Sequence, residues 1–365
     1  MDNDLWTLNQ HFAKLTANIM MMISRRKFTI RVRPSFSIPL LTSVLLCALL
    51  IPLPALAQSR SEPVIDMHLH AAHADSQGPP PIYICAPFSI WPVRDTKTGG
   101  EAYGMAFLKH PPCKSPLRSG STDEELMQRT LKIFQSRNVT ALSSGPPQVV
   151  AKWKEAGGDR ILPATPFDPK SGKPTVAELR QMVTSKQVVA FAEVGQQYDG
   201  IAANDPRMDP YYALAEELDV PVGIHMGPGP PGATYFFAPD YRMRLSSLLL
   251  LEDVLARHPK LRLWAMHAGW PLGDDAVGAL YAHPQLYVDT GIIDYAFPRK
   301  EFYLYLQRLI DAGFENRIMF GSDEMVWPDA LSAAIDTIQN APSLTPKQKR
   351  DILYNNAARF LRLKQ

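Results

Sequence analysis

Eight short runs rich in apolar and β-branched residues recur along the chain, and segments with helical periodicity separate them. The runs are Val64–His70, Val139–Ser144, Ile161–Phe167, Val188–Gly195, Pro221–Met226, Leu261–His267, Leu286–Thr290 and Arg317–Ser322. Helical spacing is clearest in Glu124–Arg137, Val176–Thr184, Tyr211–Leu218, Leu245–Arg257 and Glu301–Ala312. This alternation predicts parallel strands joined by crossover helices, and eight such units predict an α/β fold, the (β/α)8 TIM barrel. An open doubly wound sheet is the alternative, but no glycine-rich phosphate loop follows the first run.

One long interruption, Ala71–Thr122, follows the first run and is rich in proline, glycine and aromatic residues. In a barrel this inserted loop, 71–122, would lie over the carboxyl ends of the strands, where long loops are usually functional. We expect a lid or a substrate wall, formed by the aromatic residues Tyr83, Phe88, Trp91, Tyr103 and Phe107. The terminal segment Lys347–Lys364 is expected to be helical and to cover the outside of the barrel.

The first 57 residues follow the order of a secretory signal peptide: a basic stretch, an apolar run and small residues. Arg25 and Arg26 precede the apolar run Ile38–Leu53, and a small-residue cleavage pattern ends at Ala57. The run is interrupted near its end by proline and is too short to span a bilayer comfortably, so no stable membrane anchor is expected after cleavage. The Ser-Arg-Arg-x-Phe pattern resembles a twin-arginine signal. We expect an exported protein, periplasmic or secreted, with a leader over 1–57 and a barrel domain over 58–365.

Removal of the leader changes the charge and the cysteine count. The whole chain has 38 Lys+Arg and 36 Asp+Glu, a net charge of +2, but residues 1–57 hold six of the basic and two of the acidic residues, so residues 58–365 have a net charge of −2. The remaining chain is nearly balanced, which argues against a protein that binds nucleic acid through a basic surface. Cys47 leaves with the leader. Cys85 and Cys113 could pair in an oxidising compartment, and two free thiols are the alternative.

The first run ends in Asp66-Met67-His68-Leu69-His70. On a strand alternate side chains share a face, so Asp66, His68 and His70 are expected to point into the barrel and the intervening apolar residues toward the helices. Two imidazoles at this spacing can bind one cation. Two hydrogen-bonded core histidines without a metal are the structural alternative.

Four further runs end in, or just before, a side chain that can bind a metal: Glu193, His225, His267 and Asp323. The carboxyl ends of barrel strands converge at one mouth, which is where active sites of this fold lie. We therefore expect these side chains to meet the two histidines of the first run.

This ordered set resembles the amidohydrolase superfamily of metal-dependent barrels over most of residues 63–360. The resemblance rests on the His-x-His at His68, on His225 and His267, and on the Gly-Ser-Asp that ends at Asp323. The tail Asn355–Phe360 is also similar to that family's terminal segment. The sequence around these motifs is most similar to that of the amidohydrolase-related branch, which contains hydrolases and non-oxidative decarboxylases of the aminocarboxymuconate-semialdehyde type.

The resemblance implies that His68, His70, His225 and Asp323 hold a divalent metal, zinc in the first place, although manganese or iron would fit the same donors. Asp323 would also move the proton of the attacking water. His267 would hydrogen-bond that water or polarise the substrate oxygen, or would bind a second metal.

Glu193 departs from the pattern of many two-metal members, which have a carboxylated lysine at this position. The glutamate would either bridge two ions or orient the ligands of one, and one ion is the default expectation. A carboxylate paired with a barrel lysine or arginine is the structural alternative.

The first functional expectation is a hydrolase that uses a metal-activated water on a C–N or C–O bond of a small, cyclic or ester-like substrate. The alternative on the same scaffold is decarboxylation of an aromatic or unsaturated acid, which needs a cation for the substrate carboxylate. Arg242, Arg244 and Arg299 are candidates, and solvated surface charges are an equally good reading of all three. An exported binding protein without catalysis is the alternative of another class.

The expected partner is a small-molecule substrate, and a homo-oligomer is left open. Aromatic residues in the segments expected at the mouth predict an apolar or aromatic-walled pocket. They are Trp270, Tyr235, Phe236, Phe237, Tyr295 and Trp327.

Overall fold

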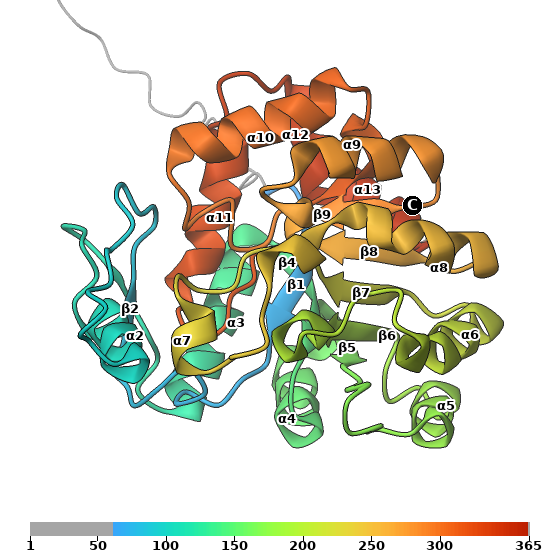
Figure 1. Ribbon diagram of the computed structural model, residues 1–365, viewed down its shortest axis with the longest axis horizontal. Coiled ribbons are helices and arrows are strands. Elements are labelled where there is room, and N and C mark those ends of the chain that lie inside the picture. The colour runs from blue at the N-terminus through green and yellow to red at the C-terminus, as the bar shows by residue number, and fades with distance from the viewer. Residues whose placement is uncertain (1–60, 364–365) are drawn as a thin grey trace, which may run out of the picture. The chain divides into compact units, whose positions relative to one another are not determined.

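Eight parallel strands form one sheet whose spatial order follows the chain, in a computed structural model that describes residues 61–363 (Figure 1). The strands are β1 (Val64–His70), β4 (Val139–Ser144), β5 (Ile161–Thr165), β6 (Ala190–Val194), β7 (Val222–His225), β8 (Leu263–Met266), β9 (Tyr287–Asp289) and β10 (Ile318–Met319). The last strand returns to the first, because the amide of Met67 donates to the carbonyl of Phe320 at 2.9 Å and that of His70 to Glu324 at 2.9 Å. The predicted TIM barrel is confirmed. The predicted signal peptide lies outside the described residues.

Helices between the strands surround the barrel (Figure 1). They are α3 (Asp123–Arg137), α4 (Pro147–Gly157), α5 (Val176–Thr184), α6 (Asp209–Leu218), α7 (Ala233–Phe236), α8 (Glu252–Arg257), α9 (Gly273–Ala282), α10 (Arg299–Asp311) and α11 (Asp329–Gln339). Side-chain caps fix the starts of α3 and α5, where Thr122 and Thr175 accept hydrogen bonds from the amides of Glu125 and Glu178. None of the helices in residues 61–363 is long and apolar enough to cross a membrane.

The helix predicted over Leu245–Arg257 is wrong in its first half. Two 3-10 turns, Met243–Ser246 and Leu248–Leu251, precede α8. The hydroxyl of Ser246 donates to the carbonyl of Gly227 at 3.1 Å and lies 2.9 Å from the side-chain nitrogen of Gln197. These bonds hold the segment against the mouth loops in place of a regular helix.

The first strand does not alternate as predicted. Ile65 and Met67 pack with apolar side chains of β4, β5, β6, β8 and β10, which can meet only inside the barrel. The pairing of β1 with β4 shifts register between Asp66 and Leu69, so one extra residue of β1 is accommodated there. As a result His68 still lies among the mouth residues, whereas the Asp66 carboxylate accepts hydrogen bonds from Ser322, next to the seam between β1 and β10.

The terminal segment closes the barrel rather than covering its outer wall. It comprises α12 (Pro346–Arg350), a π-helical turn (Asp351–Asn355) and α13 (Asn356–Phe360). Ala357, Ala358 and Phe360 pack in the interior cluster with Ile65 and Trp264. Apolar burial at this end leaves the opposite, carboxyl end of the strands as the open mouth.

The long insertion is ordered and contains its own elements. It has α2 (Gly100–Lys109) and a short antiparallel pair, β2 (Tyr83–Ile84) with β3 (Leu117–Arg118). In Figure 1 it lies at one side of the barrel next to α7, and a Cβ on Gly104 would come 3.0 Å from the Phe236 ring. The insertion therefore packs closely on the loop that follows β7.

A chain of aromatic rings joins the insertion to the mouth loops. Phe88 stacks on Phe107 at 5.0 Å between centroids and on Trp91 at 4.9 Å. Phe297 then meets Trp91 at 4.9 Å and Trp270 at 4.5 Å, both edge to face. Such ring pairs stabilise a contact beyond the area that they bury.

Cys85 and Cys113 form a disulfide with a Cα–Cα distance of 5.9 Å. The bridge lies within the insertion and closes a segment with a sequence separation of 28. Because a cross-link restricts the unfolded chain, Cys85→Ser/Cys113→Ser is expected to lower the free energy of unfolding by about 3 kcal/mol. Urea titration monitored by circular dichroism would measure this loss. Dithiothreitol should destabilise the parent by a similar amount and leave the variant unchanged; equal stability of parent and variant would contradict the prediction.

Candidate metal centre

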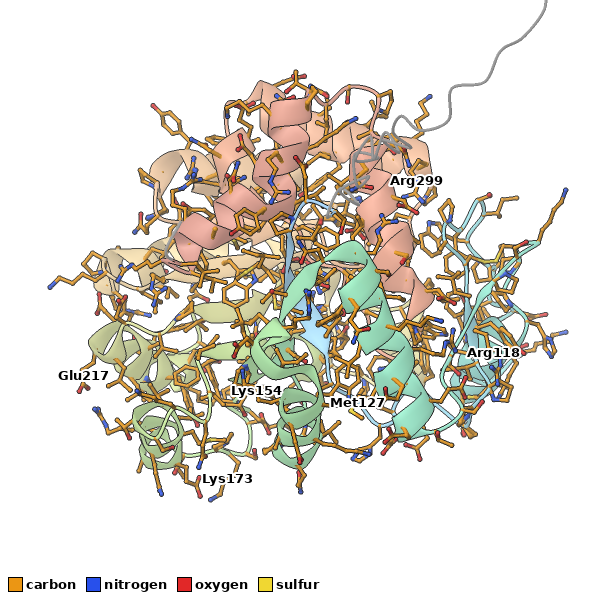
Figure 2. All side chains as sticks on the ribbon, turned by 180° about the vertical axis from the view of Figure 1, so that it is seen from behind. Arg118, Met127, Lys154, Lys173, Glu217 and Arg299 are labelled. Carbon is orange, nitrogen blue, oxygen red and sulfur yellow. A yellow bond between two sulfur atoms is a disulfide. The ribbon has the colours of Figure 1, made fainter. Side chains whose placement is uncertain are left out.

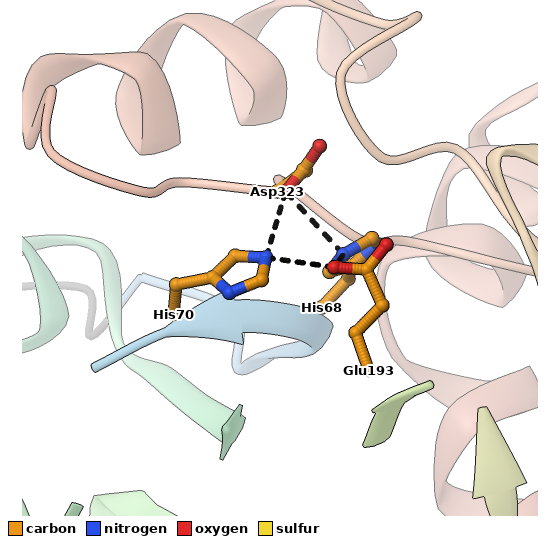
Figure 3. Close-up of side chains that lie close together, drawn as sticks. All are labelled: His68, His70, Glu193 and Asp323. Carbon is orange, nitrogen blue, oxygen red and sulfur yellow. Dashed lines mark hydrogen bonds and ion pairs between the residues drawn. The ribbon is translucent and has the colours of Figure 1, made fainter. Parts of the chain in front are cut away.

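Four predicted side chains meet at the carboxyl ends of three strands: His68 and His70 from β1, Glu193 from β6 and Asp323 after β10 (Figure 3). The Nε2 of His68 lies 3.5 Å from Glu193 Oε2 and 3.3 Å from Asp323 Oδ1. The Nε2 of His70 lies 3.2 Å and 2.9 Å from the same two oxygens. His225 is not part of this group.

A second group of donors lies near the other carboxylate oxygen of Glu193, Oε1. Its Oε1 is 2.5 Å from His225 Nδ1 and 3.4 Å from His267 Nε2, and these two nitrogens are 3.0 Å apart. The glutamate therefore presents Oε2 to one group of donors and Oε1 to the other. This is the arrangement of a carboxylate shared between two adjacent cation sites.

Hydrogen bonds fix the ring of His267 and the main chain of His225. His267 Nδ1 is 3.0 Å from the carbonyl of Gly291, which can only accept, so Nδ1 carries the proton and Nε2 turns its lone pair toward Glu193. The carbonyl of His225 accepts from the Gln196 side chain at 3.2 Å. His225 Nε2 is buried and has no hydrogen-bond partner among the described residues.

Asp289 orients the first histidine and was not anticipated from the sequence. Its Oδ2 lies 3.4 Å from His68 Nδ1 and accepts from Trp264 Nε1 at 3.1 Å. Its Oδ1 accepts from the amides of His267 and Gly291, both at 3.0 Å. A carboxylate fixed in this way holds an imidazole in one orientation toward a metal. The signal that could have found it is its place at the end of a predicted strand.

Two glycines make room for the His68 ring. A Cβ on Gly291 would lie 2.6 Å from His68 Nδ1, and one on Gly321 would lie 2.8 Å from His68 Cβ. Any larger residue at either position would displace the imidazole.

Burial and neighbouring charges have opposite effects on the pKa values of His68, His70 and Glu193. Burial disfavours protonation of His68, but the neighbouring carboxylates, Asp323 foremost, outweigh burial and raise its pKa well above the ordinary value. The same competition raises the pKa of His70 to about 9. Burial would raise the pKa of Glu193, yet His68 and His225 hold it well below its usual range. The centre thus combines an ionised carboxylate, Glu193, with two imidazoles, His68 and His70, whose surroundings favour a bound positive charge.

The donors fit a divalent cation on two observations. Four ligands at about 2.1 Å from a tetrahedral ion lie roughly 3.4 Å from one another. Three of the four separations given above for the first group are 3.2–3.5 Å, and the fourth, from His70 Nε2 to Asp323 Oδ1, is 2.9 Å. The ring nitrogens of His68 are also buried without a good hydrogen bond among the described residues. Imidazole nitrogen and carboxylate oxygen are donors that zinc, manganese and iron accept. A cation would compete with protons for the same lone pairs.

The sequence matches the amidohydrolase family model over residues 65–363. The chain belongs to the amidohydrolase family. A comparison with the curated proteins yields no matching relative for this amidohydrolase.

Solved structures share the barrel at low sequence identity. A 5-carboxyvanillate decarboxylase from Sphingomonas paucimobilis has a TM-score of 0.53 and 12% identity, covering 83% of this chain and 100% of its own. A dihydroxybenzoic acid decarboxylase from Polaromonas sp. JS666, with bound manganese, has 0.52 and 14%, with 83% and 98% covered. A protein described as a probable 2-pyrone-4,6-dicarboxylic acid hydrolase from Acinetobacter baumannii has 0.50 and 14%, with 83% and 100% covered. These likenesses show the fold, on which decarboxylases and a hydrolase both occur.

The arginines considered for a substrate carboxylate are engaged elsewhere or exposed. Arg299 donates to the carbonyl of Asp294 and to the Thr337 hydroxyl, beside α11 (Figure 2). Arg242 donates to two carbonyls of its own loop, Pro239 and Tyr241. Arg244 is an exposed residue on a 3-10 turn.

The aromatic residues expected at the mouth divide into two groups. Trp327 and Tyr295 are buried, and Trp327 Nε1 donates to the carbonyl of Ile82 under the insertion. Tyr235 and Phe237, which flank Phe236 on the loop after β7, are more than half exposed. Trp270 belongs to the aromatic chain described above.

Tyr198, which the sequence did not single out, lies beside the second donor group. It follows β6 in a 3-10 turn, Gln196–Asp199, five residues after Glu193. Its ring centroid is 4.5 Å from that of His225. Burial, joined by the charges of Glu193 and Asp323, raises the pKa of the phenol well above its usual value.

Proposed function

We propose that this amidohydrolase is a metal-dependent hydrolase that cleaves a C–N or C–O bond of a small cyclic or ester-like substrate. The observation that carries the proposal is Glu193, whose two oxygens face separate groups of imidazole and carboxylate donors. A shared carboxylate favours two adjacent divalent ions, with zinc as the first choice. Manganese is the ion bound to one decarboxylase of the same fold. Two ions side by side suit activation of water for hydrolysis better than decarboxylation.

Divalent metal bound at these donors would supply a water of lowered pKa and an electrophile for the substrate oxygen. Asp323 would take the proton from the attacking water. Its Oδ1 lies between the two histidines of β1, and its Oδ2 accepts no hydrogen bond from residues 61–363. The protonated acid would then give the proton to the leaving nitrogen or oxygen.

The remaining residues position and shield the reacting groups. His267, fixed through Gly291, directs Nε2 at the centre and would polarise the substrate oxygen or bind the second ion. The side chain of His70 is 20% exposed and that of Glu193 14%, whereas that of His68 is wholly buried. Substrate would therefore approach from the side of His70 and Glu193.

The test is a metal count combined with a turnover assay. We expect the chain from Gln58, loaded with zinc and desalted, to hold about two ions by elemental analysis and to hydrolyse dihydrocoumarin or 4-nitrophenyl acetate. Removal of the metal with a chelator should abolish turnover, and zinc should restore it. Release of carbon dioxide from aromatic acids without ester, lactone or amide hydrolysis would replace the proposal with the decarboxylase.

We also propose that the enzyme works outside the cytoplasm, as a periplasmic or secreted protein. The leader pattern of residues 1–57 and the Cys85–Cys113 disulfide support this location, since disulfides persist in oxidising compartments. Amino-terminal sequencing of the exported protein should begin at Gln58. A mature protein that retains its first residues in the cytoplasm would refute the proposal.

A further inference from the structure

Two neighbouring tyrosines beside the metal centre differ in how their hydroxyl groups are used. The rings of Tyr198 and Tyr241 stack with centroids 5.4 Å apart. The Tyr241 hydroxyl accepts from the amide of Gly229 at 2.8 Å and donates to the carbonyl of Gly227 at 2.8 Å. The Tyr198 hydroxyl forms no hydrogen bond with residues 61–363, and it is not among their enclosed polar atoms without a partner.

The Tyr198 ring is closely held. Besides Tyr241 it meets His225 at 4.5 Å and Phe237 at 5.6 Å between centroids. A Cβ on Gly229 would lie 3.1 Å from Tyr198 Cε1, closer than ordinary contact. The glycine at position 229 therefore makes room for the Tyr198 ring. The Tyr198 hydroxyl, in contrast, has no hydrogen-bond partner among residues 61–363.

The surroundings of the ring indicate what the hydroxyl can meet. Tyr198 follows the strand that carries Glu193 and contacts His225 of the second donor group. Phe237, on its other side, is 52% exposed and extends the same aromatic surface toward solvent. The Tyr198 ring therefore lies between the second donor group and the exposed Phe237 ring, and its hydroxyl has no hydrogen-bond partner among residues 61–363.

We propose that the Tyr198 hydroxyl binds the substrate directly, by donating a hydrogen bond to an oxygen of a carboxylic acid derivative whose ring lies along Tyr198 and Phe237. This inference rests on the proposed function for the identity of that oxygen. It narrows the substrate to aromatic or cyclic esters, lactones or amides. Tyr198 is then a substrate-binding residue, and Tyr241 a structural one.

The experiment compares Tyr198→Phe with Tyr241→Phe in the zinc-loaded chain, with benzoate as the probe in calorimetric titration. Tyr198→Phe should weaken benzoate binding about tenfold, since it removes one hydrogen bond to a charged oxygen. Its metal content and thermal midpoint should stay unchanged, because the ring contacts remain. Tyr241→Phe should lower the midpoint by several degrees, because it leaves the Gly229 amide unpaired, and should alter the benzoate Kd less than twofold.

Equal benzoate affinity in Tyr198→Phe and the parent, or no benzoate binding by the parent, would overturn the inference. Failure of the proposed function has a separate signature. The parent would then hydrolyse neither dihydrocoumarin nor 4-nitrophenyl acetate, while the difference in benzoate affinity would persist. If esters are hydrolysed, Tyr198→Phe should also lower kcat/KM for 4-nitrophenyl acetate by a similar factor.

Discussion

Replacement of Asp323 by asparagine is expected to lower kcat about 10³-fold while the barrel stays folded. The carboxylate has two tasks in the proposed mechanism: its Oδ1 faces His68 and His70 at 3.3 Å and 2.9 Å, and the group accepts a proton from water. An amide keeps the size and one oxygen but cannot take up that proton. Loss of a positioned general base costs typically 10²–10⁴-fold in rate.

The measurement is the initial rate on the best ester or lactone, together with metal content by elemental analysis. Asp329→Asn is the matched control. Asp329 is an exposed aspartate six residues further along, which pairs with Arg129 on the surface, and its variant should act within twofold of the parent. An Asp323→Asn enzyme that holds its full complement of metal and keeps more than a tenth of the rate would remove Asp323 from proton transfer.

The barrel and its mouth could be predicted because the carboxyl ends of all strands of a parallel barrel lie at the same face. A run of apolar residues followed by histidine or aspartate predicts both a strand and the place of its last side chain. His68, His70 and Asp323 meet for this reason, although Asp323 comes more than 250 residues later.

The division of the donors could not be predicted, because it depends on distances of an ångström. The sequence placed His225 with the two histidines of β1, whereas in the structure the second oxygen of Glu193 groups it with His267. The register shift in β1 was also hidden, since the letters Asp-Met-His-Leu-His alternate without interruption. Tyr198 lies in no motif. Its ring contact with His225 and a hydroxyl without a partner among residues 61–363 distinguish it from Tyr241, and both are visible only in the structure.

Replacement of Glu193 by glutamine is expected to reduce the bound zinc from about two ions per chain to one or fewer. In the parent, Oε2 faces the donors of β1 and Oε1 lies 2.5 Å from His225 Nδ1, so each group takes one anionic oxygen. The glutamine amide has one oxygen and no charge, so it can bind a cation in at most one of the two groups. Its NH2 donates hydrogen bonds and cannot bind a cation. The remaining ion would be held more weakly, by donors of the four histidines and Asp323.

Elemental analysis of zinc-loaded, desalted protein checks the metal count, and Glu217→Gln is the matched control. Glu217 is an exposed glutamate that pairs with Arg180 on the surface, and its variant should bind the same amount of zinc as the parent. We expect kcat on the ester to fall at least 10²-fold in Glu193→Gln, because both ions act on the reacting atoms in a two-metal site. A parent and a Glu193→Gln variant that each hold one ion with the same affinity would show that Glu193 is not a shared ligand. The mononuclear site, and with it decarboxylation, would then become the better account of this centre.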